Sequence, residues 1–165
     1  PGIPMLFMGT EFNHWGYWHA SPDSNPITSD HRLDWSLARH WEGEQMLRVV
    51  HAANTLRFEK PSLRASATEI VHADYDDGII AFKRWNDHGS VALAVINLSD
   101  GEWSSENYGV NMAGEQGSWR EIFNSQALEF GGHGIGNRSG HLSVAPDGRL
   151  HITLPQWSVI LFEKA

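Results

Sequence analysis

The residues best suited to chemistry in this sequence are a glutamate and a group of tryptophans near its start. Glu11 follows the apolar run of residues 3–8, and Trp15, Trp18 and Trp35 lie in the polar stretch after it. A carboxylate can bind a hydroxyl group or transfer a proton. An indole offers a large apolar face and one N–H donor, which suits stacking on a sugar ring. We expect these four residues to bind substrate.

Glu11 by itself does not make a catalytic centre. A single carboxylate is not a catalytic pair, and the sequence identifies no partner for Glu11. We therefore interpret Glu11 as a structural hydrogen-bonding residue in preference to a catalyst. Among all eight tryptophans, core packing is expected to outweigh ligand stacking. The group in the polar loop is the exception, because a packed core is least expected in a loop.

Three other clusters resemble active sites without their supporting features. The glycine-rich residues 131–136 lack the preceding strand, the following helix and the Lys-Ser/Thr pair of a phosphate-binding loop. The ten histidines include no pair with zinc-site spacing, so His14 and His19 are interpreted as solvated loop residues. Asp74, Asp76 and Asp77 are interpreted as a solvated hairpin turn. We expect no metal and no cofactor.

Composition narrows the choice of partner and compartment. Twelve basic and twenty acidic residues give a net charge of −8, and no basic run is present, which argues against binding to nucleic acid or to a membrane surface. No stretch approaches the roughly 20 apolar residues of a membrane span. The absence of cysteine is consistent with a reducing compartment. We expect a neutral or small partner and a cytoplasmic protein, or a plastid one if the source is a plant.

The elements that would position the candidate residues divide into two regions. Residues 3–8 predict a buried parallel strand, because they form a continuous apolar run. A long irregular stretch over residues 12–34 follows, and then an amphipathic helix over about residues 36–56. Such a strand needs neighbouring strands and covering helices that this sequence does not supply. We therefore expect the polypeptide to begin in the middle of a larger protein, with Glu11 at the exit of a barrel strand.

From Pro61 onward the sequence predicts short strands separated by turn residues. They are expected at residues 69–71, 78–85, 90–97, 119–123, 150–154 and 159–162. Asp77-Gly78 and Asp147-Gly148 predict hairpin turns. Strands without intervening helices indicate an antiparallel β-sandwich or barrel. The expected domains are residues 1–59 and residues 60–165.

Three segments carry a resemblance to a known family. They are Pro1-Gly2-Ile3-Pro4 with Leu6-Phe7-Met8-Gly9-Thr10-Glu11-Phe12, then Leu33-Asp34-Trp35, then Phe123-Asn124-Ser125 with Phe130-Gly131-Gly132-His133-Gly134-Ile135-Gly136-Asn137. Their order and spacing resemble the C-terminal part of the 1,4-α-glucan (glycogen) branching enzymes of the α-amylase superfamily. The first segment is shared across that superfamily, whereas the other two in this order favour branching enzymes.

The resemblance implies a mainly β fold, in which an antiparallel β-sandwich C-terminal domain is preceded by the last strand and helix of a (β/α)8 barrel. It implies a parent transferase of glycogen or starch biosynthesis that cleaves an α-1,4 linkage, forms a covalent glucosyl intermediate and transfers the segment to a 6-hydroxyl. The partner implied is an α-glucan such as glycogen or amylose. The catalytic carboxylates of the family leave earlier barrel strands, so no catalytic residue is expected in this chain.

Two alternatives to a branching enzyme remain open from the sequence. The chain could be a carbohydrate-binding β-module that uses Trp85, Trp103 or Trp119, or the C-terminal part of another α-amylase-superfamily glycosidase. An independent hydrolase is disfavoured, since no paired carboxylates or nucleophile and base are present. An isolated chain that exposes the edges of its first strand could also self-associate.

Overall fold

The computed structural model describes residues 3–15, 33–137 and 140–165. The chain divides into two compact units, Gly2–His51 and Ala52–Ala165, and each is described here by itself. Helix α1, Trp41–Glu59, contributes to both units. The domain boundary near residue 60 stays a prediction.

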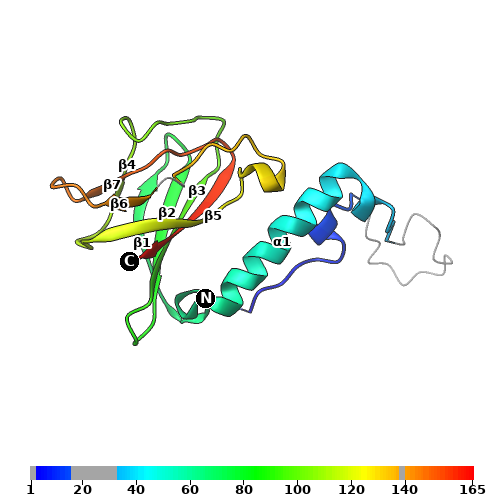
Figure 1. Cartoon of the computed structure of the whole chain (residues 1–165), viewed down its shortest axis with the longest axis horizontal. Helices are drawn as coiled ribbons and strands as arrows, with labels where there is room; N and C mark the ends of the chain where they lie inside the picture. The colour runs from blue at the N-terminus through cyan, green and yellow to red at the C-terminus, as the bar shows by residue number, and fades with distance from the viewer. Residues whose placement is uncertain (1–2, 16–32, 138–139) are drawn as a thin grey trace. The chain divides into compact units, whose positions relative to one another are not determined.

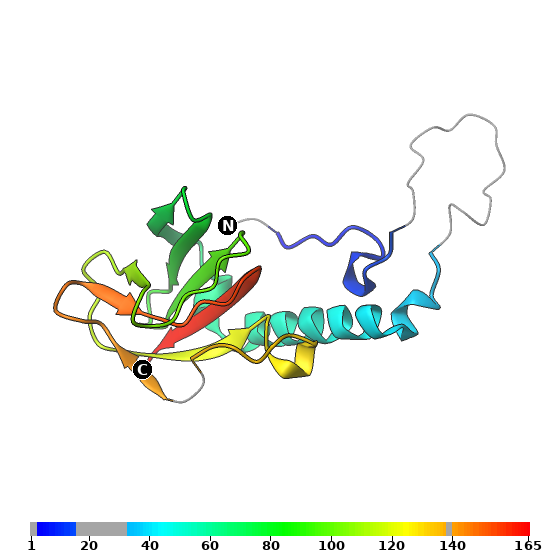
Figure 2. The ribbon, with the colours of Figure 1, turned by 90° about the horizontal axis from the view of Figure 1, so that it is seen from above.

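The larger unit is built from antiparallel strands in two sheets (Figure 1). The six-stranded sheet has the order β1-β2-β3-β8-β5-β6, and β4 pairs with β7 in a two-stranded sheet. Figure 2 shows β8 running between β3 and β5. The strands are β1 Ala67–Asp74, β2 Ile79–Trp85, β3 Val91–Asn97, β4 Gly109–Asn111, β5 Ser118–Asn124, β6 His141–Ser143, β7 Arg149–His151 and β8 Ser158–Lys164.

One apolar core lies between the two sheets. Alternate residues of the central strands point into it, because successive side chains of a strand face opposite sides of the sheet. Leu93 and Val95 of β3 and Phe162 of β8 are fully buried there. The two-stranded sheet supplies Val110 and Leu150 to the same cluster. The predicted antiparallel β-sandwich is confirmed.

The turn chemistry expected from the sequence is present. Gly78 has a φ of 69° in the turn between β1 and β2, and Gly148 has a φ of 78° in the turn before β7. Glycine adopts this left-handed conformation without the steric cost of a Cβ atom. The turn at Gly148 connects β6 and β7, which belong to different sheets, so it is a corner of the sandwich.

Most of the predicted strands are confirmed, with corrections at their ends. The strand expected over residues 150–154 ends at His151, and Leu154 instead forms an isolated bridge with Trp103. β4 and β6 were not predicted. Each has only three residues, which is too short for an alternating pattern to be recognised.

Residues 3–8 do not form a strand in this structure. Ile3 is 95% exposed and Met5 is 84% exposed. The prediction of a paired strand at this position is therefore corrected for the described chain. A strand acquires its structure from the ladder bonds of its neighbours, and among the described residues none pairs with residues 3–8.

The helix begins later and ends later than the sequence predicted. A 3₁₀ turn, η3, occupies Leu37–Arg39, and His40 is extended with a ψ of 156°, so α1 starts only at Trp41. α1 continues to Glu59, and Lys60 is again extended before Pro61. A residue before proline is disfavoured in the helical region, which explains the stop.

The Ala52–Ala165 unit fixes the segment after α1 to the sheet through polar contacts. The Arg57 guanidinium donates to the Leu63 carbonyl at 2.5 Å. The Lys60 ammonium group donates to both carboxylate oxygens of Glu163 on β8, at 2.9 and 2.8 Å. Leu63 belongs to the short 3₁₀ helix η4, Pro61–Arg64, which directly follows Lys60.

Candidate functional site

The loop that carries Glu11 is a tight turn built on a glycine. Gly9 has a φ of 88°, and its carbonyl accepts hydrogen bonds from the amides of Phe12 at 3.2 Å and His14 at 2.9 Å. A Cβ atom on Gly9 would lie 2.7 Å from the His14 Cβ and 2.9 Å from the Leu33 Cδ2. Only glycine fits this position, both for its backbone angle and for the space around it. The 3₁₀ helix η1, Thr10–Phe12, follows directly.

The Leu33-Asp34-Trp35 motif forms a second turn. The Asp34 carboxylate accepts hydrogen bonds from the Ser36 amide at 2.9 Å and from the Ser36 hydroxyl at 2.6 Å. These bonds to the charged form hold the pKa of Asp34 below its ordinary value. An aspartate that bonds the backbone two residues ahead fixes a turn, and here it precedes η3.

The two motifs meet at Phe12. The Phe12 and Trp35 ring centroids are 5.1 Å apart with the planes at 33°, and the His14 ring lies edge-on to Phe12 at 6.0 Å. Phe12 is the only large apolar side chain that is fully buried within residues 3–15 and 33–51. It is the anchor of this loop pair. Phe12 closes the first family motif, but the sequence assigned it no role of its own; its signal was an aromatic residue shortly after the Gly9 turn.

Helix α1 approaches the same junction through a glycine. Gly43 is buried in the first turn of α1. A Cβ atom there would overlap the Leu37 carbonyl and would lie 3.1 Å from the Phe12 carbonyl oxygen. The absence of a side chain at Gly43 therefore allows the helix backbone to lie against both loops.

The structure brings together only part of the predicted set. Trp15 is 79% exposed, Trp35 is 63% exposed, and Glu11 is half-buried. Among the described residues, no hydrogen bond or ring contact links Glu11 or Trp15 with Trp35. Trp18 lies outside the described residues. The Trp15 and Trp35 side chains are both largely exposed, and the Trp35 ring packs on Phe12.

The tryptophans named for a carbohydrate-binding β-module are not open platforms. Trp119 is fully buried in the core. Trp103 packs on Tyr108 with ring centroids 5.4 Å apart, and Trp85 is half-buried with the Lys83 ammonium group 4.9 Å from its ring centroid. Stacking on a sugar needs a free face, so Trp119 is excluded. The two sheets and their loops, residues 67–165, are called the β domain from here on. Its exposed indole is Trp157, which no pattern in the sequence had indicated.

The glycine-rich segment is structural. The amide of Gly132 donates to the Ala127 carbonyl at 3.1 Å, and that of Gly134 donates to the Gln126 carbonyl at 2.8 Å. A Cβ atom on Gly132 would overlap the backbone of Gln126. Amides already bonded inside the chain cannot hold an anion, which agrees with the rejection of a phosphate loop.

The end of this segment is fixed to β5 by side chains. The Asn124 amide donates to the Ile135 carbonyl at 2.8 Å. Asn137 donates through its backbone and its side chain to the Glu121 carboxylate, at 2.7 and 3.1 Å, and exchanges hydrogen bonds with the backbone of Thr153. The third segment of the family resemblance, residues 123–137, is thus held in place by hydrogen bonds within the β domain.

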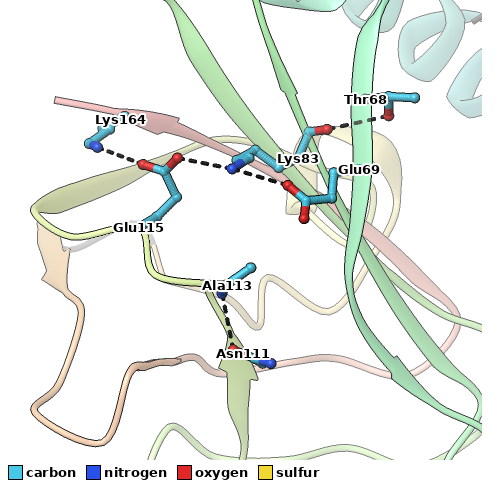
Figure 3. Close-up of polar contacts among 7 residues, drawn as sticks. All are labelled: Thr68, Glu69, Lys83, Asn111, Ala113, Glu115 and Lys164. Carbon is cyan, nitrogen blue, oxygen red and sulfur yellow. Dashed lines mark hydrogen bonds and ion pairs between the residues drawn. The ribbon is translucent and has the colours of Figure 1, made fainter.

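A group of ion pairs links three strands of the six-stranded sheet to the loop after β4 (Figure 3). The Glu115 carboxylate binds Lys83 at 3.0 Å and Lys164 at 2.7 Å, and Lys83 also lies 3.4 Å from Glu69. Hydrogen bonds from Lys164 and Lys83 hold the pKa of Glu115 below its ordinary value. Burial alone would lower the pKa of Lys83, but Glu115 and Glu69 outweigh it and raise that pKa. The group joins β1, β2, β8 and the loop before β5.

The described residues hold neither a metal-binding cluster nor a membrane-spanning helix. No three or more His, Asp or Glu side chains gather closely enough there to hold a metal ion. Nor does that part of the chain contain a helix with the length and apolar character needed to cross a membrane.

Comparison with known proteins gives the family context. Residues 70–165 match the family described as alpha amylase, C-terminal all-beta domain. The chain is 37% identical over 180 residues to a 1,4-alpha-glucan branching enzyme GlgB 2 of Xanthomonas oryzae, and 32% identical over 171 residues to GlgB 1 of Rhizobium johnstonii. These alignments cover 99% of this chain but only 23% and 22% of the relatives, whose C-terminal region it matches.

Solved structures show the same fold at lower identity. An alpha-amylase from H. orenii superposes on this chain with a TM-score of 0.52 at 19% sequence identity. The superposed region covers 88% of this chain and 25% of the amylase chain. The catalytic module of the glycogen-degrading pneumococcal virulence factor SpuA gives a TM-score of 0.53 at 11% identity, with 83% and 21% coverage.

Proposed function

The chain belongs to the alpha-amylase C-terminal all-beta domain family, and on that premise we propose that it forms the C-terminal part of a 1,4-α-glucan branching enzyme. The likeness to these enzymes extends over 99% of the chain, so it includes both the loops around Phe12 and the β domain. That observation carries the proposal. The larger enzyme would transfer segments of an α-glucan such as glycogen or amylose to a 6-hydroxyl.

This chain contributes structure and not the catalytic carboxylates. Glycosyl transfer with retention needs a nucleophile and an acid about 5 Å apart. Glu11 is a single carboxylate, and it lies on η1 beside the Gly9 turn. The catalytic pair belongs to upstream residues of the larger enzyme. Residues 1–59 close its barrel and residues 60–165 form its β domain.

Residues around Phe12 form part of the glucan path in the larger enzyme. Trp15 and Trp35 expose their indoles, and the packing of Trp35 on Phe12 reduces the entropy that the ring loses on binding. Trp18 and Glu11 complete the set proposed from the sequence. The indoles stack on glucose rings, and Glu11 accepts hydrogen bonds at the rim.

The first experiment assays the isolated chain for branching of amylose, by loss of iodine absorbance, beside a glucan-binding titration on the same sample. We expect no activity and weak or no binding. Strong binding without activity would favour a carbohydrate-binding module. Branching activity would contradict the assignment of catalysis to residues outside this chain.

The second experiment tests the glucan path in the larger enzyme that contains this chain. Labelled maltoheptaose is titrated into the Trp18→Ala and Trp35→Ala variants, with Trp157→Ala as the matched control in the β domain. Loss of one stacked indole should weaken binding by about 5- to 150-fold, taking for a sugar ring the about 1–3 kcal/mol that stacking of a planar base on an aromatic side chain contributes. Unchanged affinity in both variants would remove these residues from the path and leave the branching assignment intact.

The isolated chain should also self-associate through residues 3–8. Ile3, Met5, Leu6, Phe7 and Met8 form a continuous exposed apolar run, and runs of this kind drive association. Size-exclusion chromatography with light scattering measures the mass against concentration. A monomer at high concentration argues against the idea.

A further inference from the structure

A chain of polar contacts crosses the seam between the two sheets of the β domain. His72 Nε2 lies 2.8 Å from the Tyr108 hydroxyl oxygen, and that hydroxyl lies 3.4 Å from the Asp74 carboxylate. On its other side the His72 ring accepts a hydrogen bond at Nδ1 from the backbone amide of Asn111, at 3.3 Å. His72 and Asp74 belong to β1, whereas Asn111 ends β4. One imidazole therefore bonds to both sheets.

A β-bulge places His72 at the seam. The register between β1 and β2 shifts between Ile70 and His72, so Val71 is the extra residue. A bulge lets two successive residues face the same side of a sheet. Val71 can therefore enter the core while His72 lies over the two-stranded sheet, in edge-on contact with the Tyr108 ring at 5.7 Å.

The donors and acceptors fix the protonation of the ring. The Asn111 amide can only donate, so Nδ1 must carry a lone pair. Nε2 then carries the proton and donates to the Tyr108 oxygen, which leaves the Tyr108 hydroxyl proton for Asp74. A second proton on His72 would set two N–H donors against each other at Nδ1. The arrangement is complete only with the neutral ring protonated at Nε2.

The surroundings also disfavour a charged ring. Burial lowers the pKa of His72; Asp74 opposes this and Arg149 reinforces it. Burial, and then Asp74 and Asp77, raise the pKa of Tyr108, so the phenol keeps its proton. From β2 the ring faces Ala81, which carries no charge. On β7 the other titratable group is His151, which is paired with Asp147 at 3.1 Å.

We propose that His72 is a pH-sensitive clasp, which holds β1 to β4 while its ring is neutral and releases the Asn111 amide when the ring takes a second proton. The proposal stands on the contacts of the β domain and does not depend on the branching reaction. The folded chain binds this proton less readily than the unfolded chain, whose histidine pKa is about 6.5. The stabilisation is therefore complete above about pH 6.5 and is lost as the pH falls toward the lower folded pKa. Over that range the equilibrium constant for opening of the clasp rises by at most about tenfold per pH unit.

Amide hydrogen exchange on the full 165-residue chain tests the clasp. The protection factor of the Asn111 amide is measured between about pH 7.5 and about pH 5, with Val95 in the central strand β3 as the internal reference. Asn111 should lose protection relative to Val95 in the wild type, by up to about tenfold for each pH unit below about pH 6.5. The His72→Asn variant keeps an oxygen acceptor near the Nδ1 position and does not titrate, so its Asn111 protection should be independent of pH in this range.

Two experiments can overturn the proposal. The exchange experiment does so if Asn111 protection falls equally with pH in the wild type and in the His72→Asn variant, or if it does not fall in the wild type. The other comes from the wild type alone and does not require a folded variant: a two-bond ¹H–¹⁵N spectrum at neutral pH that shows the His72 proton on Nδ1. A spectrum with the proton on Nε2 supports the clasp.

Discussion

The β domain buries a large apolar core of its own, whereas residues 3–15 and 33–51 leave most of their apolar side chains in contact with water. Leu93, Val95 and Trp119 of the β domain are completely buried. In the first region Phe12 alone among the large apolar side chains of residues 3–15 and 33–51 is buried, and Trp15 and Trp35 are largely exposed. Both regions are rich in apolar residues, so composition does not explain the difference.

The difference lies in which partners each region finds within the chain. Each strand of the six-stranded sheet finds hydrogen-bonding neighbours inside residues 67–164, and a second sheet covers its inner face. Residues 3–8 find no ladder partner among the described residues, and in α1 Met46, Val49 and Val50 are only partly buried while Ala53 is exposed. Apolar surface left in water costs about 25 cal/mol per Å². Residues 3–15 and 33–51 thus carry apolar surface of the kind that packs against neighbouring strands and helices, as the proposed barrel would require.

Substitution of buried and exposed tryptophans should separate the two regions most strongly. Trp119→Ala should destabilise the chain by about 3–5 kcal/mol, because it removes a fully buried indole and leaves a cavity. Trp35→Ala is the matched control in the first region, and it should cost less than about 1 kcal/mol. Denaturation with urea, followed by far-ultraviolet circular dichroism, measures both. Equal losses would break the comparison.

The glycine-rich segment should be the next most sensitive feature of the β domain. Gly132→Ala should cost about 1–3 kcal/mol, because the new methyl group would overlap the Gln126 backbone, which cannot move as a side chain can. Gly89→Ala is the control: no atom lies within 4 Å of its added Cβ, and only the backbone strain at a φ of 85° remains. Thermal unfolding of the two variants should place Gly132→Ala lower. The opposite order would contradict the tight packing described for this segment.

The ion pairs at Glu115 should give a smaller effect that depends on pH. The folded-state pKa of Glu115 is lowered, so its contribution is present above the unfolded value of about 4.5 and is lost as the pH falls through the folded pKa. Glu115→Gln should cost about 0.2–1 kcal/mol at neutral pH, since the three side chains are partly exposed. Unfolding curves from about pH 7 to about pH 3 should converge for the two proteins at the acid end. Parallel curves would show that Glu115 does not contribute this way.

The smallest effect is expected at Trp15. Its side chain is 79% exposed, so Trp15→Ala should change the free energy of unfolding by no more than about 0.5 kcal/mol. Urea denaturation of the full chain provides the measurement. A loss above about 2 kcal/mol, the size expected for a buried side chain, would mean that this indole packs within the chain and is not available to a ligand.

The sequence predicted the β domain well because its signals are local. The continuous apolar run at residues 91–96 and the Asp77-Gly78 turn each determine their own segment, and β3 and the first hairpin formed where expected. The three-residue strands β4 and β6 carry too little pattern to be recognised. Their pairing depends on partners far away in the sequence, which periodicity does not reveal.

Side-chain environments were predicted less well than the strands. The residue type alone does not say whether a tryptophan is buried: Trp119, the second residue of β5, is fully buried, whereas Trp157, directly before β8, is exposed, although each follows a polar residue. The meeting of Phe12 and Trp35 joins two loops separated by a long stretch of chain, and the sequence held both motifs without showing that they touch. The His72 contacts depend on a bulge, which shifts the face of every following residue and leaves no mark in composition.

Residue-resolved amide hydrogen exchange on the full chain at neutral pH tests the central claim most directly. We predict that the amides of β3 and β8 exchange only by global unfolding, whereas those of residues 3–15 and 33–40 exchange with little protection, because only local turn hydrogen bonds on mostly exposed residues, and no strand ladder, hold them. Protection in residues 3–15 equal to that of β3 would contradict it, and would mean that the first region completes its own core without a larger protein.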